Sequence, residues 1–466
     1  MSDAIEIPNG YTPRSYQMDL WQFLEGGGKR AVGLWHRRAG KDLLAINYVV
    51  TQMVLRPGLY WHLLPTYKQG RKIVWNGRTK EGRPFLDAFP KSLIDGKNNT
   101  DMTVRMKSLN TDYSEGSVYQ VVGTDDIDSL VGANPVGCVF SEYSLQDPRA
   151  WDYIRPILME NGGWALFIYT ARGNNHGKRL YDMAMKRENW FVEKLVAGTN
   201  GTQYVNADGI EVPVVTNEQI QEAREEGYSE AMIQQEFYNS FDTPVEGSYY
   251  GTQMRMMEKQ NRITKVPHEA TLEVHTAWDL GMDDKTAIIF FQLVGREIRL
   301  IDYYENSGEG LPHYAGVLRE MYDLYGKHYF PWDVEVREIG TGKSRKQTAR
   351  ELGMRPTVVK KHGLQDGIEV VRNTLSRMYI DEDRCEHLVD ALRQYHKEED
   401  EKKSHEVEDE QGNMVRQKGY RNKPAHDWTS HPADAMRYLC MGISHIIGNN
   451  KKHPTHVDSE YDILDY

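Results

Sequence analysis

Cysteine, long apolar runs and positive charge are all scarce in this sequence. The three cysteines, Cys138, Cys385 and Cys440, include no pair at metal-ligand spacing, which excludes a disulfide framework and a structural zinc site built on cysteine pairs. No apolar run approaches the roughly 18–20 residues needed to span a bilayer. The first residues also lack the basic-then-apolar pattern of a secretory signal. We therefore expect a protein of a reducing compartment with no place in a membrane.

Acidic residues outnumber basic ones, 68 to 57, so the net charge is −11. An overall acidic balance gives no argument for nucleic-acid binding. It does not exclude such binding, because contacts to phosphate depend on local basic surface. With 466 residues and 39% hydrophobic content, the chain has enough material for two or three globular domains.

Buried-strand patterns alternate with helical patterns in the first part of the chain. Apolar segments at 30–35, 118–122, 136–140 and 164–169 are each followed by a polar cluster. This alternation predicts a doubly wound α/β fold with a mostly parallel sheet, whose ligand lies at the carboxyl ends of the strands.

A loop with the sequence His-Arg-Arg-Ala-Gly-Lys-Asp, residues 36–42, separates the predicted strand at 30–35 from a predicted helix at 43–55. The helix N-terminus offers free backbone N–H groups, and Lys41 adds a charge for the β- and γ-phosphates. The strict G-x-x-x-x-G-K-[ST] pattern is not met, since Trp35 replaces its first Gly and Asp42 its Ser or Thr. The loop thus indicates a divergent phosphate-binding loop, with an ordinary basic turn as the alternative.

The apolar strand at 136–140 ends in Ser141 and Glu142. In phosphate-loop ATPases a Glu at this place polarises the attacking water, and the residue before it is an Asp associated with Mg²⁺. Glu142 fits the first role, whereas Ser141 departs from the second. A solvated Glu at a strand end is the alternative interpretation.

The second part of the chain predicts a different sheet. Residues 273–305 read as three consecutive antiparallel strands, with Asp279 at the end of the first. A helix at about 312–325 and a strand at 329–336, with Asp333 near its start, follow. A late helix that Pro432 opens carries Asp434 one turn in. Three antiparallel strands, a helix, a parallel strand and a terminal helix form the ribonuclease H-like arrangement, which has a mixed sheet.

In that arrangement Asp279, Asp333 and Asp434 converge and bind one or two Mg²⁺ or Mn²⁺ ions, because oxygen-only ligands suit hard divalent cations. Two such ions activate a water and stabilise the leaving oxygen of a phosphodiester. The alternative is that these carboxylates are caps and turn residues. Candidates for supporting ligands or proton transfer are Glu305, Asp283, Asp284, Asp427 and His431.

We expect four segments in the chain. Residues 1–195 form a phosphate-loop ATPase domain, 196–265 a connector subdomain, 266–448 the ribonuclease H-like domain, and 449–466 a disordered polar tail. The connector is expected to contain one charged amphipathic helix at 217–238, beginning at Asn217. The charged stretch at 397–424 predicts an exposed hairpin or a mobile loop.

Both halves together resemble the large terminase subunit of tailed bacteriophages, over roughly residues 11–445. In the first half the resemblance rests on Tyr16-Gln17, on the loop at 36–42, and on segments 65–67, 140–143 and 170–173. In the second half it rests on Trp278-Asp279-Leu280-Gly281, Pro331-Trp332-Asp333 and Ser430-His431-Pro432-Ala433-Asp434-Ala435, of which the last is the most specific.

The resemblance implies a motor subunit that hydrolyses ATP to move double-stranded DNA into a procapsid and cuts concatemeric DNA with a metal-dependent endonuclease. It implies ATP and Mg²⁺ as cofactors, with Mn²⁺ as an alternative at the nuclease site. The implied partners are double-stranded DNA, a small terminase subunit, and the portal protein, on which such subunits form a homo-oligomeric ring, with a monomer in solution as the other state. The implied place is the bacterial host cytoplasm and, transiently, the viral procapsid.

It also implies roles for particular residues. Glu142 orients the hydrolytic water, and Asp279, Asp333 and Asp434 are the catalytic metal ligands of the nuclease. Residues implied to hold the nucleotide are Tyr16, Gln17, Arg37, Arg38, Gly40, Lys41, Asp42, Ser141, Thr170 and Arg172.

Two departures from the family pattern point to a linked change. A carboxylate is gained at Asp42 and one is lost at Ser141. We hypothesise an exchange in which Asp42 supplies the carboxylate and Ser141 the hydroxyl around the same ion. An arginine from a neighbouring subunit often stabilises the transition state of such motors, and Arg105 and Arg172 are candidates.

Three other protein classes remain as alternatives. A ribonuclease H-like recombinase or transposase would explain the three aspartates but would leave Lys41 and Glu142 without a role. A helicase-like translocase with an inactive nuclease predicts ATP hydrolysis without cutting. A structural DNA-binding module is disfavoured by the acidic charge balance.

Overall fold

The computed structural model of the chain describes residues 5–109, 115–125, 130, 132–206, 208–242, 247–281, 285–337, 342–399, 405–408, 414–417 and 419–448. It divides into two compact units. Unit 1 comprises Met1–Ser248 and His396–Trp428, and unit 2 comprises Tyr249–Tyr395 and Thr429–Tyr466. The boundaries of these units differ from those of the segments expected from the sequence. Residues 396–428 group with unit 1, and residues 249–265 group with unit 2. No helix within the described ranges is long and apolar enough to cross a membrane.

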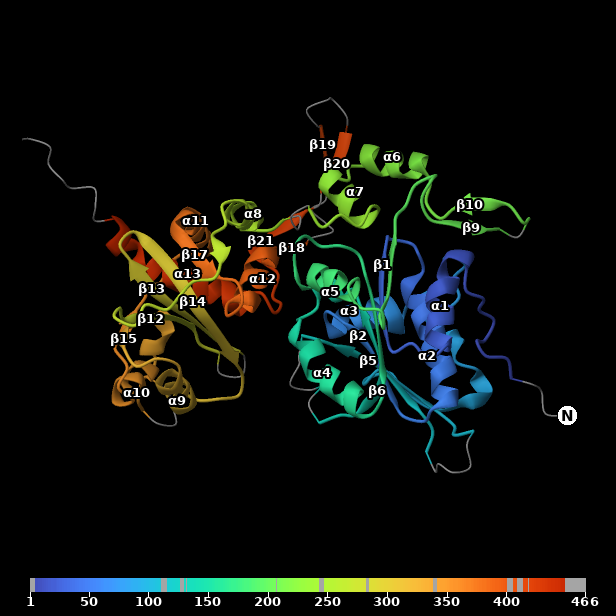
Figure 1. Ribbon diagram of the computed structural model, residues 1–466, viewed down its shortest axis with the longest axis horizontal. Helices are drawn as coiled ribbons and strands as arrows, with labels where there is room; N and C mark the ends of the chain where they lie inside the picture. The colour runs from blue at the N-terminus through green and yellow to red at the C-terminus, as the bar shows by residue number, and fades with distance from the viewer. Residues whose placement is uncertain are drawn as a thin grey trace, which may run out of the picture. The chain divides into compact units, whose positions relative to one another are not determined.

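Unit 1 is built on an eight-stranded sheet, of which β1, β2, β5 and β6 are labelled in Figure 1. The strand order is β3-β4-β5-β2-β6-β7-β1-β8. Six neighbouring strands of this sheet, β5, β2, β6, β7, β1 and β8, run parallel to one another. At one edge of the sheet, β4 pairs antiparallel with β5, and β3 pairs antiparallel with β4. The predicted mostly parallel sheet is therefore confirmed. The strands are β1 (Arg30–Trp35), β2 (Leu59–Leu64), β3 (Ile94–Asn98), β4 (Thr103–Met106), β5 (Val118–Gly123), β6 (Pro135–Ser141), β7 (Trp164–Tyr169) and β8 (Phe191–Leu195).

Helices cover both faces of this sheet, because successive strand residues point to opposite sides. Ala31 packs with α1 and α2 in one core, whereas Val32 and Leu34 pack with α4 and α5 in another. This is the doubly wound arrangement. The helical elements of this part are η1 (Ser15–Gln17), α1 (Met18–Glu25), α2 (Lys41–Leu55), α3 (Tyr67–Gly70), η2 (Arg71–Trp75), η3 (Phe85–Ala88), η4 (Lys91–Leu93), η6 (Tyr143–Leu145), α4 (Arg149–Glu160) and α5 (His176–Ala184).

The rest of unit 1 departs from expectation in one helix. The single helix expected at 217–238 is two helices, α6 (Asn217–Glu225) and α7 (Glu230–Glu236). The break falls at Gly227, which adopts a left-handed φ of 103°. Thr216 rather than Asn217 caps α6, since its side chain accepts the backbone N–H of Gln219. The remaining strands pair as β9 (Gln203–Val205) with β10 (Glu211–Pro213), β18 (Lys397–Glu399) with β21 (Tyr420–Pro424), and β19 (His405–Glu408) with β20 (Met414–Gln417).

Unit 2 has a seven-stranded mixed sheet in the order β11-β17-β14-β13-β12-β15-β16. The pairs β12–β13 and β13–β14 are antiparallel, and β15 is parallel to β12. This is the predicted ribonuclease H-like order of three antiparallel strands and a parallel fourth. The strands are β11 (Ile263–Thr264), β12 (Val274–Asp279), β13 (Thr286–Val294), β14 (Glu297–Asn306), β15 (Tyr325–Phe330), β16 (Pro356–Val358) and β17 (Met378–Asp381).

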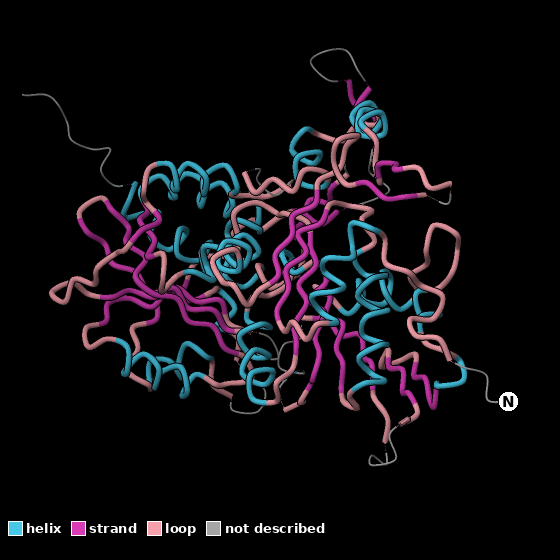
Figure 2. The backbone as a smooth tube through the Cα atoms, turned by 45° about the vertical axis from the view of Figure 1, so that its right-hand side comes forward, coloured by secondary structure: helices cyan, strands magenta, loops and turns pink. Residues whose placement is uncertain are grey.

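Two layers of helices sandwich this sheet (Figures 1 and 2). One core joins α9 and α10 to the face that carries Trp278 and Phe290, and the other joins α8 and α11–α13 to the face that carries Ala277 and Ile289. The helical elements are α8 (Gly251–Lys259), α9 (Leu311–Met321), η7 (Trp332–Glu335), α10 (Arg345–Glu351), α11 (Leu364–Thr374), η8 (Leu375–Arg377), α12 (Glu386–Gln394) and α13 (Ser430–Gly448).

The expectation that Asp333 lies near the start of a strand is wrong. The strand β15 ends at Phe330, and Asp333 lies in the short helix η7 that follows. Pro331 has no N–H to donate to the sheet, so the strand cannot continue through it. Asp333 is thus placed just beyond the carboxyl end of β15, beside the end of β12.

A buried polar chain fixes the register of β12 against β15. The Nε1–H of Trp278 donates to Oγ1 of Thr276 at 2.6 Å, and this hydroxyl lies 2.7 Å from Nδ1 of His328, the residue paired with Thr276 across the two strands. Burial lowers the pKa of His328 to about 4. With His328 neutral, its Nδ1 accepts the Thr276 hydroxyl proton while the same hydroxyl oxygen accepts the Trp278 N–H.

Candidate active sites

The phosphate-loop candidate joins β1 to α2. Gly40 caps α2 in a left-handed conformation with φ 73°, which a glycine adopts without strain. Lys41 is the first residue of α2 and is 93% buried, with its side chain 7% exposed. Its ammonium donates to the Trp35 carbonyl at 3.2 Å and pairs with Oε1 of Glu142 at 3.2 Å. A buried cation therefore lies at the N-terminus of a 15-residue helix, which is the place where phosphate binds.

Tyr16 and Gln17 lie against this loop. The Tyr16 hydroxyl and the Gln17 amide both donate to the carbonyl of Ala39, at 3.0 and 2.9 Å. The Gln17 carbonyl oxygen accepts the Tyr11 hydroxyl at 2.8 Å and the Arg14 backbone N–H at 3.0 Å. These two side chains, which the resemblance implies hold the nucleotide, thus fix the shape of the loop through their contacts within the chain.

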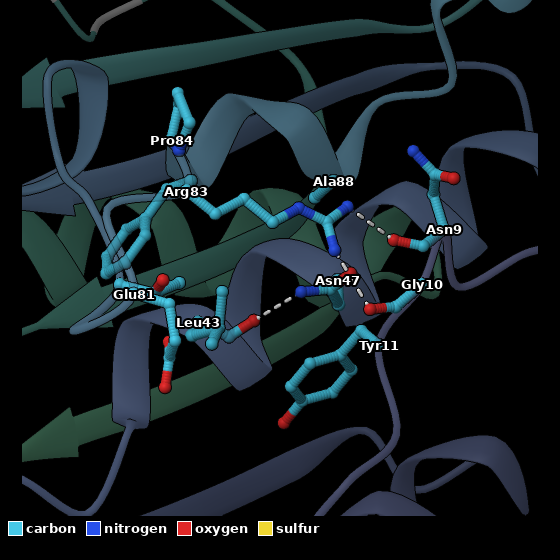
Figure 3. A pocket seen from close by; sticks show the side chains of 11 residues that line it. Asn9, Gly10, Tyr11, Leu43, Asn47, Glu81, Arg83, Pro84 and Ala88 are labelled. Atoms are coloured by element: carbon cyan, nitrogen blue, oxygen red, sulfur yellow. Dashed lines mark hydrogen bonds between the residues drawn. The ribbon is translucent and has the colours of Figure 1, made fainter.

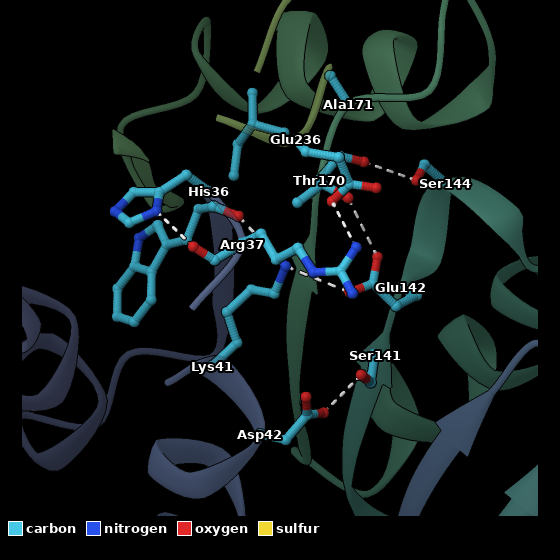
Figure 4. Close-up of polar contacts among 12 residues, drawn as sticks. His36, Arg37, Lys41, Asp42, Ser141, Glu142, Ser144, Thr170, Ala171 and Glu236 are labelled. Carbon is cyan, nitrogen blue, oxygen red and sulfur yellow. Dashed lines mark hydrogen bonds and ion pairs between the residues drawn. The ribbon is translucent and has the colours of Figure 1, made fainter. Parts of the chain in front are cut away.

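Asp42 and Ser141 are direct neighbours. The Ser141 hydroxyl donates to Oδ1 of Asp42 at 2.5 Å (Figure 4). Nε2 of His62 lies 3.3 Å from the same oxygen. Nδ1 of His62 in turn lies 3.0 Å from the Tyr119 hydroxyl. Burial alone would raise the pKa of Asp42, but His62, the Ser141 hydroxyl and the charge of Lys41 bring it below its usual value. The site therefore holds an ionised carboxylate beside a hydroxyl, 99 positions apart in the chain.

Glu142 follows β6 with a left-handed φ of 54°, an uncommon conformation for a non-glycine residue. Its Oε2 accepts the hydroxyl of Thr170, the residue after β7, at 3.3 Å, while its Oε1 pairs with Lys41. Thr170 is itself fixed by its carbonyl, which accepts the Ser144 hydroxyl at 2.8 Å. The ends of β1, β6 and β7 thus converge on one carboxylate.

Arg37 and Arg172 both face a glutamate at the end of α7. Arg37 lies 4.0 Å from Oε2 of Glu236 (Figure 4). Arg172 donates to Oε1 of the same carboxylate at 2.5 Å. Burial alone would raise the pKa of Glu236, but the charges of Arg172, Arg37 and Lys41 hold it below its usual value. Arg38 is exposed and adopts a left-handed φ of 74°. Arg172 therefore points at its own chain, whereas Arg105 is exposed on β4.

A cavity of about 260 Å³ lies along the flank of α2 (Figure 3). Leu43 and Asn47 of α2, Phe85 and the backbone around Gly10 contribute to its wall. Asn47 donates to the Leu43 carbonyl at 2.8 Å, and its side-chain oxygen has no hydrogen-bond partner in the part of the chain that the structure describes. Tyr11 connects this wall to Gln17.

In unit 2 the structure brings Asp279 and Asp434 together. Asp279 ends β12, and its Oδ2 lies 2.9 Å from Nδ1 of His431 in the first turn of α13. Asp434, one turn further along α13, accepts Arg437 at 2.9 Å. Burial and the negative charge of Asp279 outweigh Arg437 and His431 and raise the pKa of Asp434 to about 6. A buried carboxyl group whose pKa is raised by the charge of a neighbouring carboxylate is an arrangement that a divalent cation stabilises.

The third acid is close but is not part of a complete ligand set. Asp279, Asp434 and Asp333 all act on the Tyr438 hydroxyl, whose pKa burial and these three charges raise. In the described ranges, no three His, Cys, Asp or Glu side chains lie in a metal-binding arrangement. The structure therefore places Asp333 beside the pair without giving it a ligand's position.

The acidic residues expected to support the metal ligands differ in what the structure shows of them. The Glu305 carboxylate on β14 accepts the Tyr303 hydroxyl at 2.5 Å, and the Lys285 ammonium lies 3.5 Å from it. Asp427 belongs to unit 1. Asp283 and Asp284 lie outside the described residues.

Both sites have donor sets that fit the groups implied above. Gly40, Lys41 and the α2 N-terminus suit a triphosphate, and a carbon substituent at Gly40 would meet the Gln17 amide nitrogen at 3.2 Å. The all-oxygen pair of Asp279 and Asp434 suits a hard divalent cation.

Three residues of the first site were not found by sequence reasoning: His62, Glu236 and Asn239. His62 had a signal, because a histidine inside the apolar run of β2 needs a buried partner. Glu236 and Asn239 had none, since their partners lie on β1 and β8 or in the loops after β1 and β7, and the sequence between them carries no motif.

The chain thus combines an α/β unit carrying a phosphate-loop-like site with a ribonuclease H-like unit carrying an acidic pair. No family model matches it. It is 23% identical over 356 residues to the terminase large subunit of Escherichia phage T5, covering 72% of each chain. The terminase large subunit of Thermus virus P23-45 is 24% identical over 205 residues, 41% of this chain and 38% of that relative.

Solved structures similar to the chain carry the same description. The large terminase of the thermophilic bacteriophage D6E in complex with ADP covers 94% of this chain and 100% of its own, at 14% identity and a TM-score of 0.39. The nuclease domain of the P22 large terminase covers 41% of this chain and 94% of its own, at 17% identity and a TM-score of 0.29. The comparison rests on the sequence similarity to the large terminase subunits of these phages and not on the structural scores.

Proposed function

We propose that this protein is the motor and nuclease subunit of a viral DNA-packaging machine. It hydrolyses ATP to move double-stranded DNA into a procapsid and cuts concatemeric DNA with a metal-dependent endonuclease. The observation that carries the proposal is the pairing of two sites in one chain: Lys41 and Glu142 at the end of one sheet, and Asp279 and Asp434 at the end of another. The similarity to phage large terminases over 72% of the chain supports it.

At the first site, different residues bind the phosphates, orient the attacking water and supply ligands for Mg²⁺. Lys41 and the free N–H groups of α2 bind the β- and γ-phosphates of ATP. Glu142, whose carboxylate Thr170 positions at 3.3 Å, orients the attacking water. Asp42 and Ser141 supply a carboxylate and a hydroxyl side by side for Mg²⁺, which fits the exchange hypothesis.

At the second site Asp279 and Asp434 would hold a divalent cation, with Asp333 as the third acid. Bound Mg²⁺ or Mn²⁺ would generate the nucleophilic hydroxide and stabilise the leaving oxygen of a phosphodiester. His431, 2.9 Å from Asp279, orients that carboxylate and is placed to move a proton. Burial and the negative charge of Asp279 raise the pKa of Asp434, and a bound divalent cation would balance the charges of the two carboxylates.

The remaining parts of the proposal follow from the relationship to phage terminases. The partners are double-stranded DNA, a small terminase subunit and a portal protein, on which the subunits form a ring. The site of action is the bacterial host cytoplasm and the procapsid. Tyr16, Gln17, Arg37, Arg38, Gly40 and Arg172 complete the proposed nucleotide site. We also propose that 1–195, 196–265 and 266–448 act as motor, connector and nuclease segments.

The test is to assay the wild-type chain for both activities. ATP hydrolysis is measured with and without double-stranded DNA, and plasmid cleavage is measured with Mg²⁺ or Mn²⁺ and with a chelator. DNA-stimulated hydrolysis together with chelator-sensitive cutting is expected. Cutting without hydrolysis would favour the recombinase class, and hydrolysis without cutting would favour a helicase-like translocase.

A further inference from the structure

Three parallel strands of unit 2 end on the side of the sheet where the acidic pair lies. The strands β12, β15 and β16 are neighbours in that order, and both pairs are parallel. The last residue of β12 is Asp279, and β15 is followed by Trp332 and Asp333. Soon after β16 come Lys360 and Lys361. Because the carboxyl ends of neighbouring parallel strands lie on the same side, these acids, the tryptophan and the lysines follow one another along it.

The segment after β16 is held against its neighbours on both sides. The backbone N–H of Val359 donates to the Phe330 carbonyl at 2.8 Å, so the chain stays paired with the last residue of β15. The His362 ring packs edge-on against Tyr438 of α13, with ring centroids 5.9 Å apart. Burial and the charges of the three aspartates raise the pKa of Tyr438, which places this tyrosine at the acidic site. Residues 360–362 therefore form part of the rim of that site.

Trp332 is an exposed aromatic side chain on the same rim. Its exposed fraction is 41%, and of the tryptophans that the structure describes it alone is exposed. The Lys361 ammonium lies over its ring, 4.4 Å from the centroid. This cation–π contact holds the ring in one orientation beside Asp333. The exposed surface of the ring is thus preorganised for a partner.

The two lysines after β16 are exposed and carry uncompensated charge. Neither Lys360 nor Lys361 pairs with a carboxylate within the described ranges, although the whole chain has a net charge of −11. By contrast, Lys343 and Lys346 of the same unit pair with glutamates at 2.8 and 2.5 Å. Two unpaired cations beside an exposed aromatic ring form the local basic surface that phosphate groups need.

We propose that Trp332, Lys360 and Lys361 bind a short unpaired stretch of DNA next to the bond that is cut. Trp332 stacks on one unpaired base, and the lysines bind the phosphates beside it. Basic side chains combined with an aromatic ring suit single strands of any sequence, because every base has a π face. The inference rests on the proposed nuclease function and specifies the form of DNA that its site takes, a strand separated locally from its complement.

The experiment measures DNA binding by the full-length chain with Ca²⁺, a hard cation that suits oxygen ligands. The probes are a short single strand that carries one 2-aminopurine, whose fluorescence falls when it stacks, and the paired duplex of the same sequence. We expect Trp332→Ala to bind the single strand roughly five- to hundredfold more weakly and to lose the quench, with duplex binding unchanged. Trp332→Phe keeps a ring and should retain most of the affinity. Tyr153→Ala is the matched control, because Tyr153 is a 49% exposed aromatic side chain on α4, and it should behave as the wild type.

The salt dependence of binding tests the lysines separately from the ring. Lys360→Gln should reduce the slope of log affinity against log salt concentration by about 0.7, the contribution of one phosphate contact on a single strand. Lys343→Gln is the matched control, since the charge of Lys343 is already paired with Glu351, and it should leave the slope unchanged. An unchanged slope in Lys360→Gln would remove the lysine from the proposed site.

Plasmid cutting is measured on the same preparations, so failure of the proposal can be told from failure of the nuclease function. If Trp332→Ala binds and quenches the single strand as the wild type does, while the wild type cuts plasmid, the proposal is overturned and the nuclease function stands. An equal loss for single strand and duplex would also overturn it, because the ring would then not recognise an unpaired base. A wild type that neither binds DNA nor cuts plasmid would refute the nuclease function, and the proposal with it.

Discussion

The contact between Ser141 and Asp42 supports a double substitution as a test of their linked roles. In Asp42→Ser/Ser141→Asp the carboxylate and the hydroxyl trade places across the 2.5 Å hydrogen bond that joins them. We expect the double variant to hydrolyse ATP faster than either single variant. The reason is that each single change leaves the site with two hydroxyls or two carboxylates, whereas the double change restores one of each.

The structure gives the size of the expected effect. The hydrogen bond to an ionised, buried carboxylate is worth about 1.5–3 kcal/mol. Two carboxylates at this distance would repel as well, so Ser141→Asp alone should be the worse single variant. A coupling of about 2 kcal/mol corresponds to roughly 30-fold in kcat/KM. Full recovery is not expected, because His62 lies 3.3 Å from the carboxylate at position 42 and not from one at 141.

The assay is a double-mutant cycle on kcat/KM for ATP hydrolysis, measured over a range of Mg²⁺ concentrations in the presence of DNA. Ser117→Ala serves as the matched control. Ser117 is a buried serine whose hydroxyl donates to the Met53 carbonyl at 2.7 Å, away from Asp42. Its combination with Asp42→Ser should be additive. A double swap no more active than the worse single variant would refute the exchange.

Two further predictions concern stability. Asn239→Ala removes the three hydrogen bonds that the Asn239 side chain makes to the backbone of Leu34, Ala171 and Leu195. The free energy of unfolding of unit 1, measured by urea titration, should fall by about 2–4 kcal/mol. A loss below about 1 kcal/mol would show that these bonds do not hold the segment in place. Burial holds the pKa of His328 at about 4, below the value of about 6.5 in an unfolded chain. The unfolded state therefore binds the additional proton between these values, and stability is complete above pH 6.5 and falls as the pH is lowered to 4, by up to about 1.4 kcal/mol per pH unit. His328→Gln should flatten this slope, as measured by hydrogen exchange of β15 amides, and an unchanged slope would show that His328 does not cause it.

Much of the framework could be predicted from local pattern. Apolar runs such as 164–169 and 287–294 mark central strands, because a strand buried on both faces has no polar side. The loop at 36–42 could be placed at a strand end for the same reason. The mostly parallel character of the first sheet and the arrangement of β12 to β15 in the second follow from such segments together with the rules for connecting parallel strands. The order of all eight strands in the first sheet does not follow from them.

The rest depends on contacts that no local pattern encodes. Asp333 was placed on a strand because the residues around it favour one, but Pro331 ends the strand two residues earlier. The break at Gly227 was missed because a helix tolerates a glycine when neighbours hold it. The grouping of 396–428 with unit 1 joins segments about 150 positions apart, which a single sequence does not reveal.

The residues of the candidate sites also divide into those that local sequence pattern predicts and those that only the folded chain reveals. The residue types that carry the chemistry, Lys41, Glu142, Asp279 and Asp434, are visible because their positions at strand and helix ends are local features. The groups that position them are not visible: Thr170 reaches Glu142, and Asn239 reaches Leu34, only in the folded chain.

The central claim is that one chain carries two separate active sites, one for ATP hydrolysis and one for DNA cleavage. One comparison tests this claim most directly. Plasmid cleavage with Mn²⁺ or Mg²⁺ and ATP hydrolysis are measured on the same preparations of wild type, Asp279→Ala and Lys41→Ala, with Glu297→Gln as an exposed control on β14. We expect Asp279→Ala to lose cutting and keep hydrolysis, and Lys41→Ala to do the reverse. Cutting that survives Asp279→Ala would contradict the account, because the acidic pair would then not be the nuclease site.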